Sequence, residues 1–183
     1  MYPNQRDYTI MGKQSTERSR RLVLVPCPFQ GHITPMLQLG TVLYSRGFSI
    51  TVVHTIYNSP DPNNYPEFSF VPIPDGLSDQ DIRSWDFVGN VMAINENCRE
   101  SFKRFLQQLS TTEEEKGVCI ISDELLFFAE AVADDLELPS IILRTTSAAT
   151  CLARSALVKL NEQGLVLSQG IYSYRKTSFA FVC

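Results

Sequence analysis

The stretch PCPFQGHITP, residues 26–35, decides how the rest of this chain is interpreted. A short apolar run, Leu22 to Val25, precedes it, and apolar residues at helical spacing follow it from Met36 to Tyr44. This order predicts a strand, a tight loop and a helix. It places His32 at the carboxyl end of a first strand and beside a helix start, where open α/β sheets bind ligands. A histidine in that position is suited to act as a general base near neutral pH.

Size and composition describe a globular protein with a real core. The chain has 183 residues, of which 44% are hydrophobic, and this argues against disorder. A net charge of -4 argues against a nucleic-acid binder, and the longest apolar windows are too short to predict a membrane span. Five dispersed cysteines without a CxxC pair, with only two histidines, predict reduced thiols, a cytoplasmic location and no metal site.

Strands and helices are predicted to alternate along the chain. After the first pair, the patterns predict strands at 48–54, 68–73, 118–121 and 140–143, and helices at 86–109, 125–136 and 148–160. The longest helix has a candidate break at residues 95–97. Repeated β-α alternation predicts an α/β fold with a doubly wound parallel sheet. Residues 1–20 are expected to be a disordered extension, and 21–168 to form the domain.

Two polar side chains are expected at the same edge of this sheet. His32 follows the first strand and Asp123 ends a later one, so both lie at carboxyl ends, which can be neighbours in a doubly wound sheet. A carboxylate bonded to one imidazole nitrogen fixes the tautomer and stabilises the imidazolium. The alternative is that each residue only caps a helix. Glu124 should point away from Asp123, toward solvent.

A second polar group, Thr145 to Ser147, follows the strand at 140–143 and starts the next helix. A helix N-terminus favours phosphate or sugar oxygens, although an ordinary N-cap without a ligand is the alternative. The sequence has no GxGxxG, GxxxxGK[ST] or GxSxG motif. It therefore encodes no dinucleotide or P-loop cradle, and an α/β-hydrolase is disfavoured.

Residues 28–39, PFQGHITPMLQL, resemble the N-terminal motif of the plant family 1 UDP-glycosyltransferases. Later segments agree with that family in the same order: 54–55, 66–70, 73–77, 95–98, 119–123 and 138–148. The similarity runs from about Arg21 to Leu167 and is nearest to the branch of cytokinin and steviol-glycoside glucosyltransferases. A run of motifs in fixed order is far more specific than any single one.

The resemblance implies a GT-B fold, in which an N-terminal Rossmann-like domain holds the acceptor and a C-terminal one holds the UDP-sugar. His32 would be the general base, Asp123 its orienting partner, and Thr145 a donor-binding residue. The residues that would bind the acceptor are Gln30, Gly31, Thr34, Leu125, Phe128 and Thr146. The implied reaction is inverting transfer of a sugar, with UDP-glucose as the expected co-substrate, to a small lipophilic acceptor, without metal or other cofactor.

The resemblance stops near Ser168. Residues 169–183 no longer match and are expected to be a divergent, irregular tail, and the family's C-terminal donor-binding box is absent. The chain is therefore expected to be a truncated N-terminal half of a GT-B protein. Two functions stay open: a UDP-glycosyltransferase represented by its acceptor half, or a catalytically inactive acceptor-binding fragment or interaction module. Apolar surface near the cleft would then favour self-association.

Overall fold

A computed structural model describes residues 20–78, 86–110 and 117–165. It divides the chain after Thr145 into two units. Among the described residues, the first unit contains the sheet and the helices that pack on it, and the second contains helix α5 (Ala148–Glu162). The expected tail at 169–183 and the expected boundary at 168 lie outside the described residues, as does the expected extension apart from Arg20.

Five parallel strands form the sheet of the first unit, in the order β3-β2-β1-β4-β5. Their bounds are β1 (Arg21–Val25), β2 (Ser49–Thr55), β3 (Ser69–Ile73), β4 (Val118–Asp123) and β5 (Ser140–Leu143). The order runs one way from β1 to β3 and the other way from β4 to β5. The sequence-based prediction of a doubly wound α/β fold is therefore confirmed. The two strands at the point of reversal, β1 and β4, are direct neighbours, with Val25 paired to Ser122.

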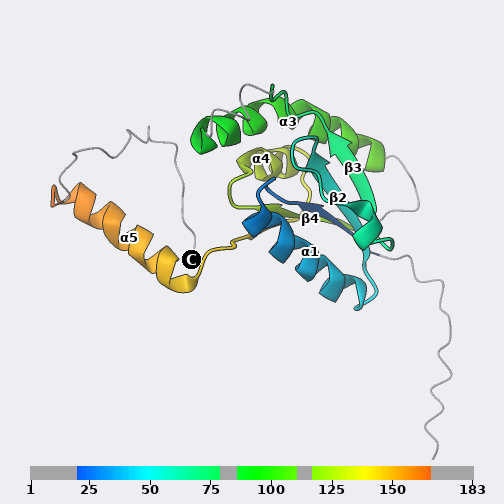
Figure 1. Ribbon diagram of the computed structural model, residues 1–183, viewed down its shortest axis with the longest axis horizontal. Coiled ribbons are helices and arrows are strands. Elements are labelled where there is room, and N and C mark those ends of the chain that lie inside the picture. The colour runs from blue at the N-terminus through cyan, green and yellow to red at the C-terminus, as the bar shows by residue number, and fades with distance from the viewer. Residues whose placement is uncertain (1–19, 79–85, 111–116, 166–183) are drawn as a thin grey trace, which may run out of the picture. The chain divides into compact units, whose positions relative to one another are not determined.

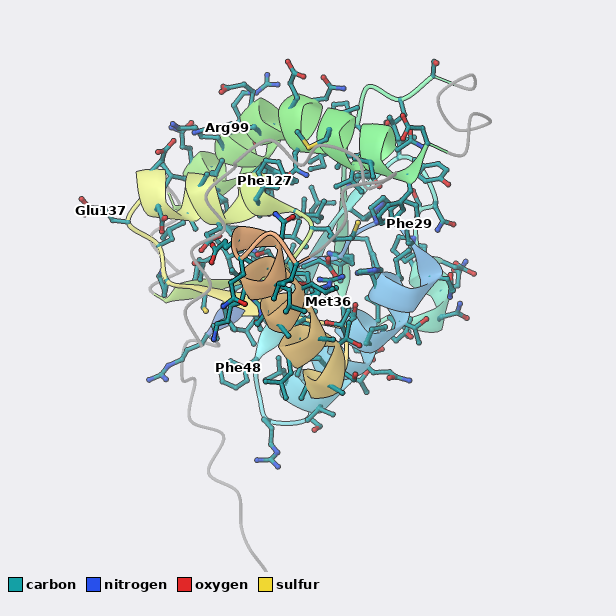
Figure 2. The ribbon with its side chains drawn as sticks, turned by 90° about the vertical axis from the view of Figure 1, so that its left-hand side faces the viewer. Phe29, Met36, Phe48, Arg99, Phe127 and Glu137 are labelled. Atoms are coloured by element: carbon teal, nitrogen blue, oxygen red, sulfur yellow. The ribbon has the colours of Figure 1, made fainter. Side chains whose placement is uncertain are left out.

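Helices cover both faces of this sheet (Figure 1). Helix α1 (Gln30–Tyr44) packs on one face, while α3 (Phe87–Ser110) and α4 (Phe127–Asp135) pack on the other. A short 3₁₀ helix, η1 (Pro62–Asn64), lies in the segment between β2 and β3. Each face has its own apolar core, and Met36 of α1, labelled in Figure 2, is fully buried in one of them.

Alternation along β4 decides which core each of its side chains enters. Val118 and Ile120 belong to the core under α3 and α4, whereas Cys119 and Ile121 pack with the α1 layer. Successive side chains of a strand point to opposite faces. Asp123, two residues after Ile121, therefore faces α1.

Two helices differ from the sequence-based expectation. Helix α1 begins at Gln30, six residues before the expected start at Met36, so His32 lies in its first turn and not in a loop. Pro35 lies inside this helix; it removes one backbone hydrogen bond without ending the helix. Helix α3 is continuous through residues 95–97, where a break was expected, because the Asn95 amide bonds the carbonyl one turn earlier.

Ser122 supplies a prediction about stability. Among the buried side-chain nitrogen and oxygen atoms of the described ranges, its hydroxyl oxygen is the one without a hydrogen-bond partner. It shares a sheet face with the apolar Val118 and Ile120. An unpaired buried polar group costs about 1–3 kcal/mol. We expect Ser122→Ala to raise the free energy of unfolding by about 1 kcal/mol, measured by urea denaturation.

The matched control is Ser45→Ala, because the Ser45 hydroxyl donates to the Val42 carbonyl at 2.7 Å. This variant should be neutral or slightly less stable than the parent. A lower unfolding midpoint for Ser122→Ala would show that its hydroxyl does have a partner in solution.

Candidate active site

The candidate site lies where the order of the strands reverses. His32 comes from the first turn of α1, directly after β1, and Asp123 is the last residue of β4. Thr145 follows β5 and belongs to the same unit. Because β1 and β4 are parallel neighbours, these residues meet at the carboxyl edge of the sheet. This is the edge at which doubly wound proteins bind ligands.

The histidine and the aspartate are in direct contact. His32 Nδ1 lies 2.8 Å from Asp123 Oδ2, and the aspartate side chain is fully buried while that of the histidine is 19% exposed. A carboxylate can only accept, so Nδ1 carries a proton and donates it. In the neutral imidazole, Nε2 is then the acceptor nitrogen. The sequence thus correctly predicted that these two residues, 91 positions apart, lie together.

Thr145 also contacts the imidazole of His32. Its Oγ1 lies 3.2 Å from His32 Nδ1. Since Nδ1 carries a proton, the threonine oxygen accepts a share of that hydrogen bond. The sequence placed Thr145 at this edge, but it gave no indication of a contact with His32.

The turn after β4 fixes the orientation of the Asp123 carboxylate. Its Oδ1 accepts a hydrogen bond from the Leu125 backbone N–H at 3.0 Å. The Asp123 carbonyl accepts from the Leu126 N–H at 2.9 Å. One carboxylate oxygen is therefore held by the turn, and the other, Oδ2, is directed at His32.

These contacts raise the pKa of His32. The hydrogen bond to Asp123 is the largest cause, burial opposes it, and the negative charges of Asp123 and Glu124 add to it. The expectation that Glu124 faces solvent is wrong. Its side chain is only 11% exposed and lies 3.7 Å from Arg144 Nε, because its backbone N–H donates to the Leu143 carbonyl and holds it beside the end of β5.

An aromatic group lies next to the histidine. The Phe29 ring contacts the rings of His32 and Tyr57 at centroid distances of 6.4 Å, and that of Phe87 at 4.7 Å. Phe29, which immediately precedes α1, is labelled in Figure 2. The Phe87 side chain is 46% exposed. We call Phe29, Tyr57 and Phe87 the aromatic wall; the sequence analysis missed it, although Phe29 stands three residues before His32.

Two of the expected acceptor-binding residues face a different hollow. Gln30 and Thr34 lie on one side of α1 and, with residues 58–61, 64 and 65 among others, line a pocket of about 180 Å³ whose lining does not include His32. Gln30 Nε2 donates to Thr34 Oγ1 at 3.2 Å. Gly31 is exposed, and a Cβ added there would meet nothing within 4 Å. The first turn of α1 thus presents these residues and His32 in different directions.

The remaining expected residues, Leu125, Phe128 and Thr146, make other contacts. Leu125 is partly buried and packs against the core under α3 and α4. Phe128 is only 2% exposed and meets Phe102 edge to face at 5.5 Å, so it fills the core instead of facing the edge of the sheet. Thr146 belongs to the second unit, where its Oγ1 lies 3.6 Å from Cys151 Sγ.

Neither a metal centre nor a membrane span emerges from the described parts of the chain. In residues 20–78, 86–110 and 117–165, no group of three or more histidine, cysteine or acidic side chains could hold a metal ion. Over the same ranges, none of the helices combines the length and apolar character needed to cross a bilayer. The other histidine, His54, is buried, and its Nδ1 bonds the Thr55 carbonyl at 2.9 Å.

Comparison with known sequences finds close relatives, although no family model matches the chain. It is 47% identical over 133 residues to UDP-glycosyltransferase 76E1 of Solanum lycopersicum, covering 73% of this chain and 28% of the relative. It is 41% identical to the flavonol 3-O-glucosyltransferase UGT76E12 of Arabidopsis thaliana, covering 82% and 33%. UDP-glycosyltransferase 76G1 of Stevia rebaudiana is 40% identical, covering 82% and 34%. The chain spans about a third of the length of the curated relatives it matches.

Solved structures show the same fold. Os79 of Oryza sativa, in complex with U2F and trichothecene, matches 76% of this chain and 32% of its own with a TM-score of 0.64 and 21% identity. UGT2 of Phytolacca americana, complexed with UDP-2fluoro-glucose and pterostilbene, matches 79% and 35% with a TM-score of 0.60 and 23% identity. In sequence and in fold, the resemblance of this chain to the plant UDP-glycosyltransferases is therefore confirmed, over about a third of the length of those proteins.

Proposed function

We propose that this chain is the acceptor-binding part of a UDP-glycosyltransferase. The proposed enzyme transfers a sugar, with glucose as the first candidate, from a UDP-sugar to a small lipophilic acceptor and inverts the configuration at the anomeric carbon. The observation that carries the proposal is the 2.8 Å contact between His32 and a fully buried Asp123 at the carboxyl edge of the sheet. The relatives support it, since their names describe UDP-glycosyltransferases and, in one case, a flavonol 3-O-glucosyltransferase.

In the proposed reaction, Nε2 of neutral His32 takes the proton of an acceptor hydroxyl as its oxygen attacks the anomeric carbon. The bond from that carbon to the acceptor oxygen forms while the bond to the phosphate oxygen breaks, and UDP leaves with the electron pair. The imidazolium that results is stabilised by Asp123. General-base help of this kind contributes about 10²–10⁴-fold in rate.

The aromatic wall suggests the class of acceptor. Rings beside the base offer apolar contact area to a flat or ring-bearing alcohol or phenol. The acceptor-binding roles of Gln30, Gly31, Thr34 and Thr146 stay predictions from the sequence resemblance, and Gln30 and Thr34 line a hollow that does not include His32. Leu125 is assigned an apolar contact, with Phe128 packed in the core beneath it.

Thr145 is assigned to the donor side. Its oxygen accepts from His32, so its own proton remains to be donated to a sugar or phosphate oxygen of the donor. No metal or other cofactor enters this proposal, and a cytoplasmic location stays a prediction from the composition.

A second function is an acceptor-binding or interaction module without transfer. The observation that favours it is the edge strand β5, where Ile141 and Ile142 are 56% and 40% exposed. Adjacent residues of a strand point to opposite faces, so apolar surface is exposed on both faces of that edge. Such a surface favours association, here with a second copy of the chain.

An assay of transfer and an assay of binding separate the two functions. The 183-residue chain is incubated with radiolabelled UDP-glucose and a panel of phenols and terpenoid alcohols, and acceptor binding is followed by calorimetry. Transfer that disappears in His32→Ala would establish the enzyme. Acceptor binding without transfer, in a chain that sediments as a dimer, would establish the module, and neither binding nor transfer would overturn both.

A further inference from the structure

Asn95 of α3 forms a bridge to the turn that follows β4. Its side chain is buried, with 4% of the residue exposed. Nδ2 donates to the Val91 carbonyl and to the Leu125 carbonyl, both at 2.8 Å, and Oδ1 accepts from the Phe128 backbone N–H at 3.0 Å. Two carbonyls and one N–H dictate the orientation of the amide, and both of its protons are used.

The residue that Asn95 holds is the one that orients Asp123. Leu125 donates its N–H to Asp123 Oδ1 at 3.0 Å, and it offers its carbonyl to Asn95. The other carboxylate oxygen of Asp123, Oδ2, accepts the hydrogen bond from His32. A continuous series of hydrogen bonds thus runs from α3 through the turn to the imidazole.

We propose that Asn95 is a positioning residue for the candidate base: its amide holds the Leu125 peptide so that Asp123 directs one carboxylate oxygen at His32. Its value to catalysis rests on the proposed function, but the geometry it imposes on the pair does not. Without the amide, the Leu125 carbonyl and the Phe128 N–H lose their partners in a buried region. A buried polar group without a partner costs about 1–3 kcal/mol, so the turn rearranges to pair them elsewhere.

The pKa of His32 reports on this geometry, because its hydrogen bond to Asp123 is the main cause of its elevation. Three other charged or titratable groups surround the pair. Glu124 acts on His32 through its charge and is itself paired with Arg144, and the thiol of Cys27 is buried beside Asp123 and has a raised pKa. None of these groups is hydrogen-bonded to the Asn95 side chain.

The test is an NMR titration of the full chain, which has only two histidines. The Cε1–H signal of His32 is assigned with a His32→Gln variant and followed in the parent, in Asn95→Leu and in Asp123→Asn. Leucine has a similar volume but cannot form hydrogen bonds. We expect the pKa of His32 to fall in Asn95→Leu by a clear fraction of its fall in Asp123→Asn.

Asn97→Leu is the matched control, because Asn97 lies on the same helix and its amide donates to the Asp75 carbonyl at 2.9 Å, away from Asp123. It should destabilise the fold without moving the pKa of His32. Asn95→Ser, which is smaller and still polar, replaces Asn95→Leu if the latter does not give a native circular dichroism spectrum.

A folded Asn95 variant with the parent's pKa of His32 would overturn the inference, as would an equal shift in Asn97→Leu. The outcome is separate from that of the transfer assay. A chain that shows the expected shift but neither transfers a sugar nor binds an acceptor would sink the proposed function and leave the positioning role of Asn95 intact.

Discussion

Replacing His32 by alanine should lower the rate of sugar transfer by about 10²–10⁴-fold, the usual contribution of a general base. The effect should lie in kcat, because the imidazole acts on the proton in the transition state and adds little to ground-state binding. It is best measured in a chimera in which residues 20–165 replace the matching part of UDP-glycosyltransferase 76E1 of Solanum lycopersicum, with which the chain shares 47% identity over 133 residues. The chimera supplies the remaining length of the relative in one polypeptide.

His54→Gln is the control, since His54 is also a histidine at the end of a strand but is buried and bonds a backbone carbonyl. It should change thermal stability more than kcat. A chimera that keeps its kcat after His32→Ala would remove His32 from the chemistry, whatever its contact with Asp123.

The strands themselves were predictable because each one carries a local signal. The run from residues 48 to 54 alternates and is β-branched, and β2 forms there. Pro72 is typical of an edge strand, since proline cannot donate to a ladder, and β3 is an edge of the sheet. The pair His32 and Asp123 followed from the same logic, because parallel strands bring their carboxyl ends to one edge.

The rest of the site depends on contacts that no local pattern encodes. Glu124 was expected in solvent from strand alternation alone, but the sequence carries no sign that Arg144, twenty residues later, comes within 3.7 Å. A break was expected at residues 95–97, and free amides such as that of Asn95 do compete with the helix backbone. In the structure this amide is engaged by a turn 30 residues away. The aromatic wall likewise joins Phe29 to Phe87, which belong to different elements.

Asp123→Asn should be nearly as damaging as the loss of His32, although it preserves shape. In the parent, the carboxylate accepts from Nδ1–H and leaves Nε2 as the base. An amide can turn its NH₂ toward Nδ1, which favours the opposite tautomer with the proton on Nε2. The base is then absent, and a loss on the order of 10²–10⁴-fold in kcat follows. The chimera described above provides the measurement.

The pH dependence of the same variant identifies the cause. Asp123 raises the pKa of His32, and the base acts only when neutral, so the rate of the parent should rise with pH through that elevated pKa. In Asp123→Asn the pKa of His32 falls, and the residual rate should reach its plateau at lower pH. If the plateau rate fell but the rate still rose over the same pH range as in the parent, Asp123 would act on something other than the imidazole.

Stability should change with pH in the corresponding direction. A histidine whose pKa is raised in the folded state contributes stability that is complete below its unfolded pKa of about 6.5 and is lost as pH rises through the folded value. The difference in unfolding free energy between the parent and Asp123→Asn should therefore be larger at acidic than at alkaline pH, measured by urea denaturation on both sides of this interval. Asp135→Asn, which removes an exposed carboxylate paired with Arg99 and Lys103, should show no such dependence there, because neither of its partners is a histidine. If both substitutions gave the same pH dependence, the effect would reflect overall charge, and the specific coupling between His32 and Asp123 would be refuted.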